Sequence, residues 1–227
     1  MSSPFEQNFV YVVRFNVDDD RAIEFDDWYV RRHGPDVVRD VPGFAAARSY
    51  RVTDGPQRIL SIYDISDPAI LVSDEYTFMR STDAQGNSIR ATALSDSTLC
   101  IYSEVARAAG TVSKGRSDVP RFTSADISTL RFDLDNVDQE QALIDWFASP
   151  GPAFGADAAA LGSYLCRHAA DHPKAPSTEP QWIVVTDWLT SSGAGDALDL
   201  VDQVQAVVGK VARATLDHAR RVYEYQG

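Results

Sequence analysis

The residue of this sequence best suited to proton transfer is His33. Together with Ala22, Phe25 and Tyr29 it recurs at steps of three and four residues, which places the four side chains on one stripe of a helix. This stripe is the apolar one, so we expect it to face a sheet and to turn the imidazole inward. Because an imidazole titrates near neutral pH, His33 could serve as a general acid or base.

The residues after His33 bear on its charge. Gly34 and Pro35 follow directly, and this pair predicts that the helix ends there. A helix C-terminus favours a cationic imidazole, which would make His33 an acid rather than a base. The alternative is a structural role, in which His33 caps the helix or hydrogen-bonds a loop carbonyl.

Other aromatic and charged side chains are candidates for holding a substrate. Tyr76 falls in a second predicted helix, where its phenol could orient a carbonyl or phenolate; a half-buried structural tyrosine is the alternative. Arg14 has Arg131 at the matching place in the second half of the chain, which indicates a structural ion pair. The further candidates for substrate contact are Phe25 and Trp28 in the first helix, and Tyr11, Arg14 and Tyr50 in strands, where alternation turns only some side chains inward.

The remaining histidines predict no metal site. His168 and His172 have the spacing of a helix-borne ligand pair, but they precede a Pro-rich loop and no HExxH motif follows. We therefore expect both to face solvent in a loop, and His218 to lie exposed at the last helix. No nucleotide-binding GxGxxG or GxxxxGK[ST] motif and no GxSxG hydrolase motif occurs, so the sequence predicts neither a cofactor nor a metal.

Strand-like segments recur in the same order in both halves of the chain. Residues 14–18 read Arg-Phe-Asn-Val-Asp and residues 131–135 read Arg-Phe-Asp-Leu-Asp, and each segment is followed by a helix start and an Asp-Trp pair. Further strands are predicted at residues 47–51, 58–64 and 100–104, and at residues 161–165, 181–187 and 221–225. Each half thus has the order of a ferredoxin-like βαββαβ unit.

This repeat predicts an α+β fold of two tandem ferredoxin-like units that pack sheet to sheet as an intramolecular α/β barrel. The predicted divisions are a first half at residues 1–107, a Gly- and Ser-containing linker at 108–121 and a diverged second half at 122–227. After its Asp-Trp pair the second half reads Phe-Ala-Ser-Pro-Gly-Pro at 147–152, without a histidine. We therefore expect one working pocket, in the first half, and one scaffold.

Composition excludes several classes of partner. The 227 residues contain 21 Lys+Arg and 33 Asp+Glu, a net charge of −12, without the basic stripe that neutralises nucleic-acid phosphates. An acidic surface also disfavours anionic lipid. No stretch approaches the roughly 18 apolar residues that span a bilayer, and no signal peptide is visible. Only two cysteines occur, Cys100 and Cys166, and we therefore expect a cytoplasmic protein. Because one chain supplies both repeated units, we expect a monomeric pseudo-dimer or a homodimer.

One continuous stretch resembles a known family. Residues 24–38 read Glu-Phe-Asp-Asp-Trp-Tyr-Val-Arg-Arg-His-Gly-Pro-Asp-Val-Val, followed by Val-Pro-Gly-Phe at 41–44 and Ala-Arg-Ser-Tyr at 47–50. Over residues 8–105 the chain resembles the dimeric α/β-barrel superfamily, in its EthD-like and muconolactone-isomerase-like branches. The resemblance implies a catalytic role for His33, because a histidine at the matching helix position is catalytic in a methylmuconolactone isomerase-type enzyme. The second histidine of that enzyme has no match here.

These observations predict a cofactor-independent enzyme of the isomerase, lyase or cyclase type. Proton transfer at His33, with Tyr29 or Tyr76 orienting the substrate, would act on a small apolar carbonyl or phenolic metabolite, aromatic or lactone-like. The superfamily resemblance leaves three alternatives open: a cofactor-free monooxygenase, a non-catalytic small-molecule binder, and a haem-dependent variant with an axial histidine.

Overall fold

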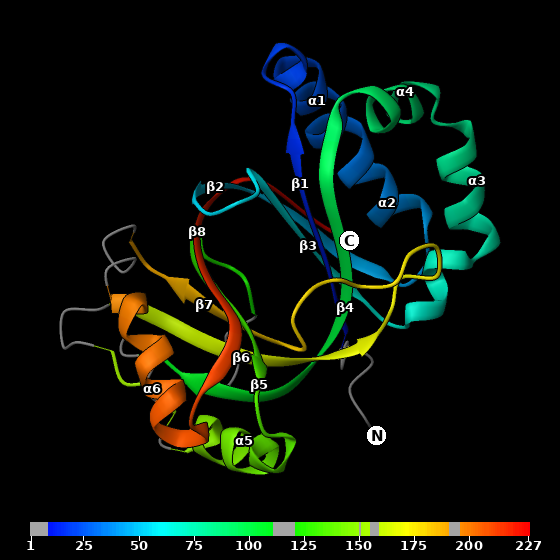
Figure 1. Ribbon diagram of the computed structural model, residues 1–227. Helices are drawn as coiled ribbons and strands as arrows, with labels where there is room; N and C mark the ends of the chain where they lie inside the picture. The colour runs from blue at the N-terminus through cyan, green and yellow to red at the C-terminus, as the bar shows by residue number, and fades with distance from the viewer. Residues whose placement is uncertain (1–8, 111–120, 150, 155–158, 191–195) are drawn as a thin grey trace.

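The fold is a mixed α+β arrangement in which antiparallel strands close into a barrel (Figure 1). The computed structural model describes residues 9–110, 121–149, 151–154, 159–190 and 196–227. Around the barrel the strands follow the order β1-β3-β2-β8-β5-β7-β6-β4. Their bounds are β1 (Phe9–Val17), β2 (Phe44–Asp54), β3 (Ile59–Ile65), β4 (Leu94–Ala109), β5 (Asp126–Leu134), β6 (Ala160–Ala170), β7 (Trp182–Trp188) and β8 (Val211–Gln226).

The helices form two groups on opposite sides of the barrel (Figure 1). The first group comprises α1 (Ala22–Trp28), the π-helical turn η2 (Tyr29–His33), α2 (Gly34–Asp40), α3 (Asp74–Thr82) and α4 (Ala84–Thr92). The second comprises α5 (Glu140–Ala148) and α6 (Asp199–Val208). Single 3-10 turns precede four of these helices: η1 (Asp19–Arg21), η3 (Pro68–Val72), η4 (Val137–Gln139) and η6 (Asp196–Leu198).

Two long strands join the halves of the chain. β4 and β8 each have 16 residues, and each pairs with strands of both halves: β4 with β1 and β6, and β8 with β5 and β2. All eight strands are therefore hydrogen-bonded in one closed barrel, whose interior is lined by residues of both halves. This closure leaves no free sheet edge in the barrel.

Alternation along the strands divides the side chains between two environments. In β1, Tyr11 and Phe15 face the helices α1–α4 and belong to the core beneath them. Val10 and Val12 face the barrel interior and belong to a separate cluster that contains residues of both halves. Consecutive residues of one strand thus serve different cores, as the period of two requires.

The predicted linker at residues 108–121 lies mostly outside the described residues. β4 continues to Ala109, and the described chain resumes at Arg121. None of the described helices is both long and apolar enough to cross a membrane.

Candidate active site

A continuous helical segment from Ala22 to Asp40 positions His33. The predicted helix end at Gly34 is wrong, because α1 passes through the π turn η2 directly into α2. In this turn the Gly34 N–H bonds to the carbonyl of Tyr29, five residues back. Pro35 lacks an N–H and would clash with the preceding turn of a regular α-helix, and the wider π turn lets the helix continue past it. Such turns occur frequently at functional sites.

An inner pocket lies between this segment, the α3–α4 pair and the sheet. Its volume is about 210 Å³, within a lining that is largely aromatic. Residues from β1, β2, β3 and β4 form its floor. The lining consists of Tyr11, Val13, Phe15, Trp28, Tyr29, His33, Val37, Phe44, Tyr63, Tyr76, Arg80, Arg90, Leu94, Ser97 and Leu99.

His33 stands in the wall of this pocket as an uncharged imidazole. It is 9% exposed, and its ring stacks on that of Trp28 with centroids 4.9 Å apart. Its Nδ1 has no hydrogen-bond partner among the described residues. Burial, followed by the charges of Arg90 and Arg80, lowers the pKa of His33 to about 3. The prediction of a cationic acid is therefore wrong, since burial disfavours the charged form.

A structural cap is also not what His33 forms. The helix continues beyond it, and the N–H that closes α2 belongs to Val41 and bonds to the carbonyl of Val37. Nδ1 has no hydrogen bond within the described part of the chain, and the imidazole is held by contacts of its ring with the rings of Trp28 and Tyr29. It can accept a proton from a molecule in the pocket.

Tyrosine hydroxyls gather at the floor of the pocket. Tyr29 donates to Ser61 Oγ at 2.9 Å and shares a short hydrogen bond with Tyr63. Burial raises the pKa of Tyr29 to about 12 and holds the pKa values of Tyr11 and Tyr63 well above their usual range. These residues therefore present hydroxyl groups, not phenolates, at neutral pH.

Two arginines enter the pocket from the α3–α4 pair. Arg80 Nη1 donates to the hydroxyl of Tyr76 at 3.3 Å. The guanidinium carbon of Arg90 lies 5.1 Å from the ring centroid of Trp28. Burial, and then the like charge of Arg80, lower the pKa of Arg90, so the two cations lie close enough to repel each other. Sequence patterning gives no indication of this pair, because it depends on how two separate helices approach.

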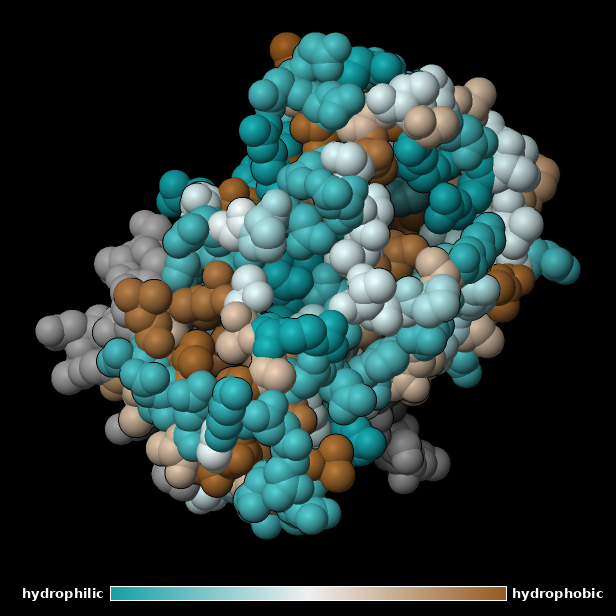
Figure 2. Space-filling view, in the orientation of Figure 1, coloured by the Kyte–Doolittle hydropathy of each residue, from teal (hydrophilic) through white to brown (hydrophobic). Residues whose placement is uncertain are grey.

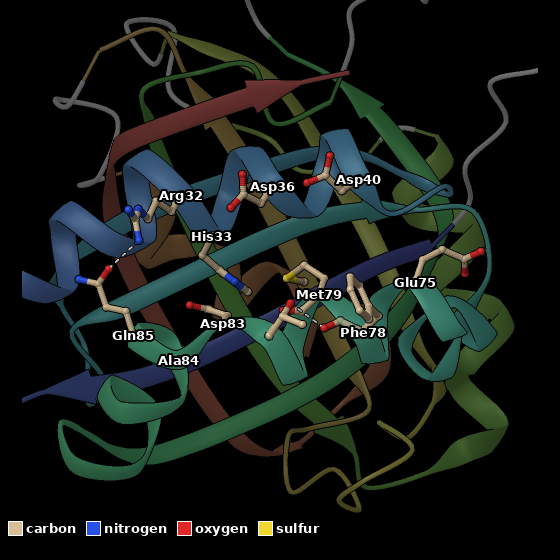
Figure 3. Close-up of a pocket in the computed structure, with 11 residues that line it drawn as sticks. Arg32, His33, Asp36, Asp40, Glu75, Phe78, Met79, Asp83, Ala84 and Gln85 are labelled. Carbon is tan, nitrogen blue, oxygen red and sulfur yellow. Dashed lines mark hydrogen bonds between the residues drawn. The ribbon is translucent and has the colours of Figure 1, made fainter.

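An outer cleft opens on the other side of His33, between α2 and the α3–α4 pair. Figure 3 shows the imidazole pointing into this space, and Figure 2 shows a hollow there among mostly hydrophilic surfaces. The cleft has a volume of about 980 Å³. It is lined by Arg32, His33, Asp36, Asp40, Glu75, Phe78, Met79, Thr82, Asp83, Ala84 and Gln85. His33 borders both spaces and so stands where they adjoin.

The other predicted site residues divide into two groups. Tyr11, Trp28, Tyr29 and Tyr76 line the inner pocket with His33. Phe25 lies behind it, stacked on Tyr29 with centroids 4.8 Å apart, and supports that ring without lining the pocket.

Arg14 and Tyr50 are not brought to the pocket. Both are fully buried in the barrel interior. Arg14 Nη2 lies 2.7 Å from Asp217 Oδ2 of β8, and Arg131 bonds to the same carboxylate. Tyr50 packs in the cluster shared by the halves. Their positions favour a role in joining the halves, since alternation turns Arg14 away from the side that Tyr11 faces.

His172 is a residue of the pocket surroundings that sequence reasoning missed. It was expected in solvent but is 3% exposed, and it stacks on Tyr11 with centroids 5.7 Å apart. Its Nδ1 accepts from the N–H of Lys174, and its Nε2 is buried without a partner among the described residues. Burial, then Arg80 and Lys174, lower the pKa of His172 to about 4. No local pattern could show that the β6–β7 loop reaches the first half.

The other two histidines also differ from expectation. His168 lies on β6, part-buried, with Nε2 3.2 Å from Asp171. His218 lies on strand β8, not at a helix, and is half-buried. Among the described residues no group of three or more His, Cys, Asp or Glu side chains could hold a metal ion.

The corresponding region of the second half is packed with apolar side chains. Phe132, Leu143, Phe147, Trp182 and Leu200 form its core and are fully buried. α5 ends at Ala148, whereas the first-half helix continues through a π turn and α2. Among the described residues, no helix lies between α5 and β6.

Comparison with known proteins identifies the fold. No family model and no curated protein sequence matches the chain. Among solved structures, it is similar to an anthrone oxidase-like protein, with TM-score 0.64 and 12% identity over 98% of this chain and 94% of the other. A putative monooxygenase from Fusobacterium nucleatum has TM-score 0.58 and 7% identity, covering 96% and 94%. The putative chlorite dismutase TA0507 has TM-score 0.54 and 10% identity, covering 94% of each chain. The chain thus shares the fold of these structures.

Proposed function

We propose that this protein is a cofactor-independent oxidising enzyme that acts on a small aromatic carbonyl or phenolic compound in the inner pocket. The observation that carries the proposal is the neutral imidazole of His33, with an unpartnered Nδ1, in the wall of an aromatic pocket. A neutral imidazole can accept a proton, and its pKa of about 3 makes it a weak base while the pocket is empty. The surrounding rings offer stacking surface to an aromatic ligand.

The reaction begins with transfer of a proton from an acidic C–H group of the substrate to the imidazole of His33. The carbanion, delocalised onto the substrate's carbonyl oxygen or ring, reacts with dioxygen. For a methylene group the balance is loss of both hydrogens, entry of one oxygen atom as a new carbonyl and release of the other as water. The substrate supplies all four electrons, so the step requires no flavin or metal.

The tyrosines are suited to orient the substrate. Because burial raises the pKa of Tyr29 to about 12, its hydroxyl stays protonated and donates to Ser61, while its oxygen can accept a hydrogen bond from a substrate. Tyr76, bonded to Arg80 and stacked on Phe44 with centroids 5.7 Å apart, fixes another hydroxyl at the pocket wall. Trp28 and Tyr11 provide further ring faces. In this proposal Tyr29 and Tyr76 orient the substrate, which is the role that the sequence predicts for them.

Haem does not fit the described residues. The inner pocket of about 210 Å³ is below the roughly 300–1,000 Å³ typical of sites for drug-sized ligands. The Nδ1 of His33 lacks the acceptor that normally orients a metal-ligating histidine. The outer cleft is lined by Asp36, Asp40, Glu75 and Asp83, which would repel the propionates of haem. We therefore derive no step through haem.

Oxidation is favoured over isomerisation or elimination by the kind of protein that shares the fold. The isomerase or lyase prediction has the same first step and differs in the fate of the carbanion. Similarity to an anthrone oxidase-like protein and to a putative monooxygenase supports a carbanion that meets dioxygen. Descent of the two halves from one repeated unit is a finer part of the same proposal, supported by the matching element order of the halves. An EthD-like origin, a cytoplasmic location and a monomeric pseudo-dimer or homodimer stay predictions from the sequence.

The test is oxygen uptake with a panel of small phenols and aryl ketones, with isotope-labelled dioxygen to follow incorporation. We expect the wild-type protein to incorporate one labelled oxygen atom, and His33→Gln to be slower by at least about a hundredfold, the usual contribution of a general base. His168→Gln, which changes a histidine outside the pocket, is the matched control. Product formation that continues unchanged without dioxygen would contradict oxidation and indicate the isomerase or lyase alternative.

A further inference from the structure

The inner pocket is electropositive in a protein that is otherwise acidic. Two of its fifteen lining residues are arginines and none is Asp or Glu, although the chain has a net charge of −12. Cations in an apolar setting are costly unless they are paired with an opposite charge. The composition of the pocket thus indicates an anionic ligand.

Arg80 has no carboxylate partner among the described residues. Its contacts are with Tyr76, through the hydrogen bond of 3.3 Å to the hydroxyl and a guanidinium carbon 5.7 Å from the ring centroid. These contacts fix the guanidinium group at the pocket wall but leave its charge uncompensated. The same charge reaches across the pocket, where it lowers the pKa values of His33 and His172.

The positive charge of Arg90 is only weakly compensated by a carboxylate. It donates to Asn87 Oδ1 at 2.9 Å, and its closest carboxylate oxygen among the ion pairs of the described residues, Asp83 Oδ2, is 3.6 Å away. That oxygen already accepts from the indole N–H of Trp28 at 3.0 Å. The second oxygen of Asp83 accepts from the backbone of Gly86. Asp83 is therefore occupied in holding α1 to α4.

We propose that the inner pocket selects aromatic ligands that carry an ionised oxygen, held between the guanidinium groups of Arg80 and Arg90 with the ring against the tyrosines. The planar donor groups of arginine match the oxygens of a phenolate or a carboxylate. This inference rests on the proposed function for the identity of the pocket as the substrate site. It adds that Arg80 and Arg90 determine specificity.

An anion at this place also makes the proposed base more effective. The charges of Arg90 and Arg80 contribute to the low pKa of His33. A bound oxyanion offsets both charges, so the imidazole is a stronger base when the ligand is present than when the pocket is empty. The charges of Arg80 and Arg90 then account both for selection of the ligand and for activation of the base.

The experiment compares three monocyclic probes by quenching of tryptophan fluorescence and by equilibrium dialysis: para-nitrophenolate, para-nitrobenzoate and the neutral para-nitroanisole. We expect the wild-type protein to bind at least one anion at least about tenfold more tightly than the neutral probe, the value of one charge-assisted hydrogen bond. The tighter of the two anions identifies the ligand as a phenolate or a carboxylate. Equal binding of the neutral probe, or no binding of any probe, would overturn the inference.

Variants of Arg80 and Arg90 test whether these residues cause the preference for anionic over neutral probes. Arg80→Gln and Arg90→Gln should each weaken the anions about tenfold or more and leave the neutral probe unchanged, whereas Arg80→Lys and Arg90→Lys should retain part of the preference. Arg32→Gln, which removes a cation from the outer cleft, is the matched control and should change the binding of neither the anions nor the neutral probe. Equal weakening of the binding of all probes in the pocket variants would contradict the inference.

Anion binding without turnover would refute the proposed function alone, and turnover of neutral compounds without charge preference would refute this inference alone.

Discussion

Two buried ionisable residues, His33 and Asp187, show how surroundings determine charge. The helical stripe in the sequence correctly predicts that His33 turns inward, where it is 9% exposed. It does not predict neutrality, because burial of the imidazole and then the charges of Arg90 and Arg80, which lie on another part of the chain, lower its pKa. The repeat likewise aligns Asp64 with Asp187, yet their surroundings differ.

Asp64 is paired and Asp187 is not. Asp64 lies 2.7 Å from Arg48 and 2.8 Å from Arg121. Asp187 is fully buried and belongs to none of the ion pairs of the described residues; one oxygen accepts from the N–H of Thr123 and the other has no partner there. Burial raises the pKa of Asp187 to about 7. The folded protein thus holds a proton that the unfolded chain releases near pH 4.

This difference predicts a pH-dependent gain from Asp187→Asn. Between about pH 4 and 7 the folded state binds the proton and the unfolded state does not, so the contribution of Asp187 to stability falls as pH rises through this window. Asparagine does not ionise, so the variant avoids this loss of folding stability, which amounts to about 1.4 kcal/mol per unit of pKa shift. We expect urea unfolding to show the variant more stable than wild type by a few kcal/mol at about pH 8, with little difference at about pH 4.

Asp64→Asn is the matched control for this experiment. It removes the carboxylate that Arg48 and Arg121 share, while Arg48 keeps its ion pair with Glu224 and Arg121 keeps its ion pair with Glu104. Loss of one carboxylate from this buried network should destabilise the protein at about pH 8. A gain from Asp187→Asn that is the same at both pH values would show that the carboxylate is not the cause.

At the scale of elements, the junction of η2 and α2 is the feature that brings His33 to the pocket. Gly34 lies at this junction against β8. A Cβ atom built at Gly34 would lie 2.5 Å from Cε1 of Tyr223. Glycine is thus needed for close approach of the helix to the last strand.

Gly34→Ala therefore tests whether contact or helix propensity dominates. Propensity alone predicts a gain of about 1 kcal/mol for alanine in a helix. The contact with Tyr223 predicts a loss of about 1–3 kcal/mol, because the ring must move. We expect a net loss in thermal or urea unfolding, reversed in the background of Tyr223→Ala. A gain in the single variant would contradict the close packing of α2 on β8.

The sequence predicts β1 and β5 well because their signal is local, whereas β4 and β8 extend well beyond the predicted segments at 100–104 and 221–225. The predicted segments at 14–18 and 131–135 end within one residue of the ends of β1 and β5. The π turn is not predictable in this way, since Gly34-Pro35 has the composition of a helix end. Nor is the contact of His172 with Tyr11, which depends on a loop of the second half reaching the first. What the sequence misses in the site is the part made by contacts between distant segments.

At the scale of the whole molecule, the halves share an order of elements but differ in what they enclose. A buried ion pair joins Arg14 of the first half to Asp217 of the second, and Arg131 of the second half shares this carboxylate. Beneath its helices the first half encloses a pocket, and the second encloses packed side chains such as Phe147 and Trp182. The division into one working pocket and one scaffold stays a prediction.

The central claim is that His33 removes a proton from a ligand in this pocket. The most direct measurement is hydrogen–deuterium exchange at the acidic C–H of an aryl ketone, followed by NMR in deuterated buffer without dioxygen. We predict exchange catalysed by the wild-type protein and by Arg32→Gln, and exchange at least about a hundredfold slower with a folded His33→Gln protein. Wild-type exchange no faster than in buffer, or undiminished exchange in His33→Gln, would contradict the account.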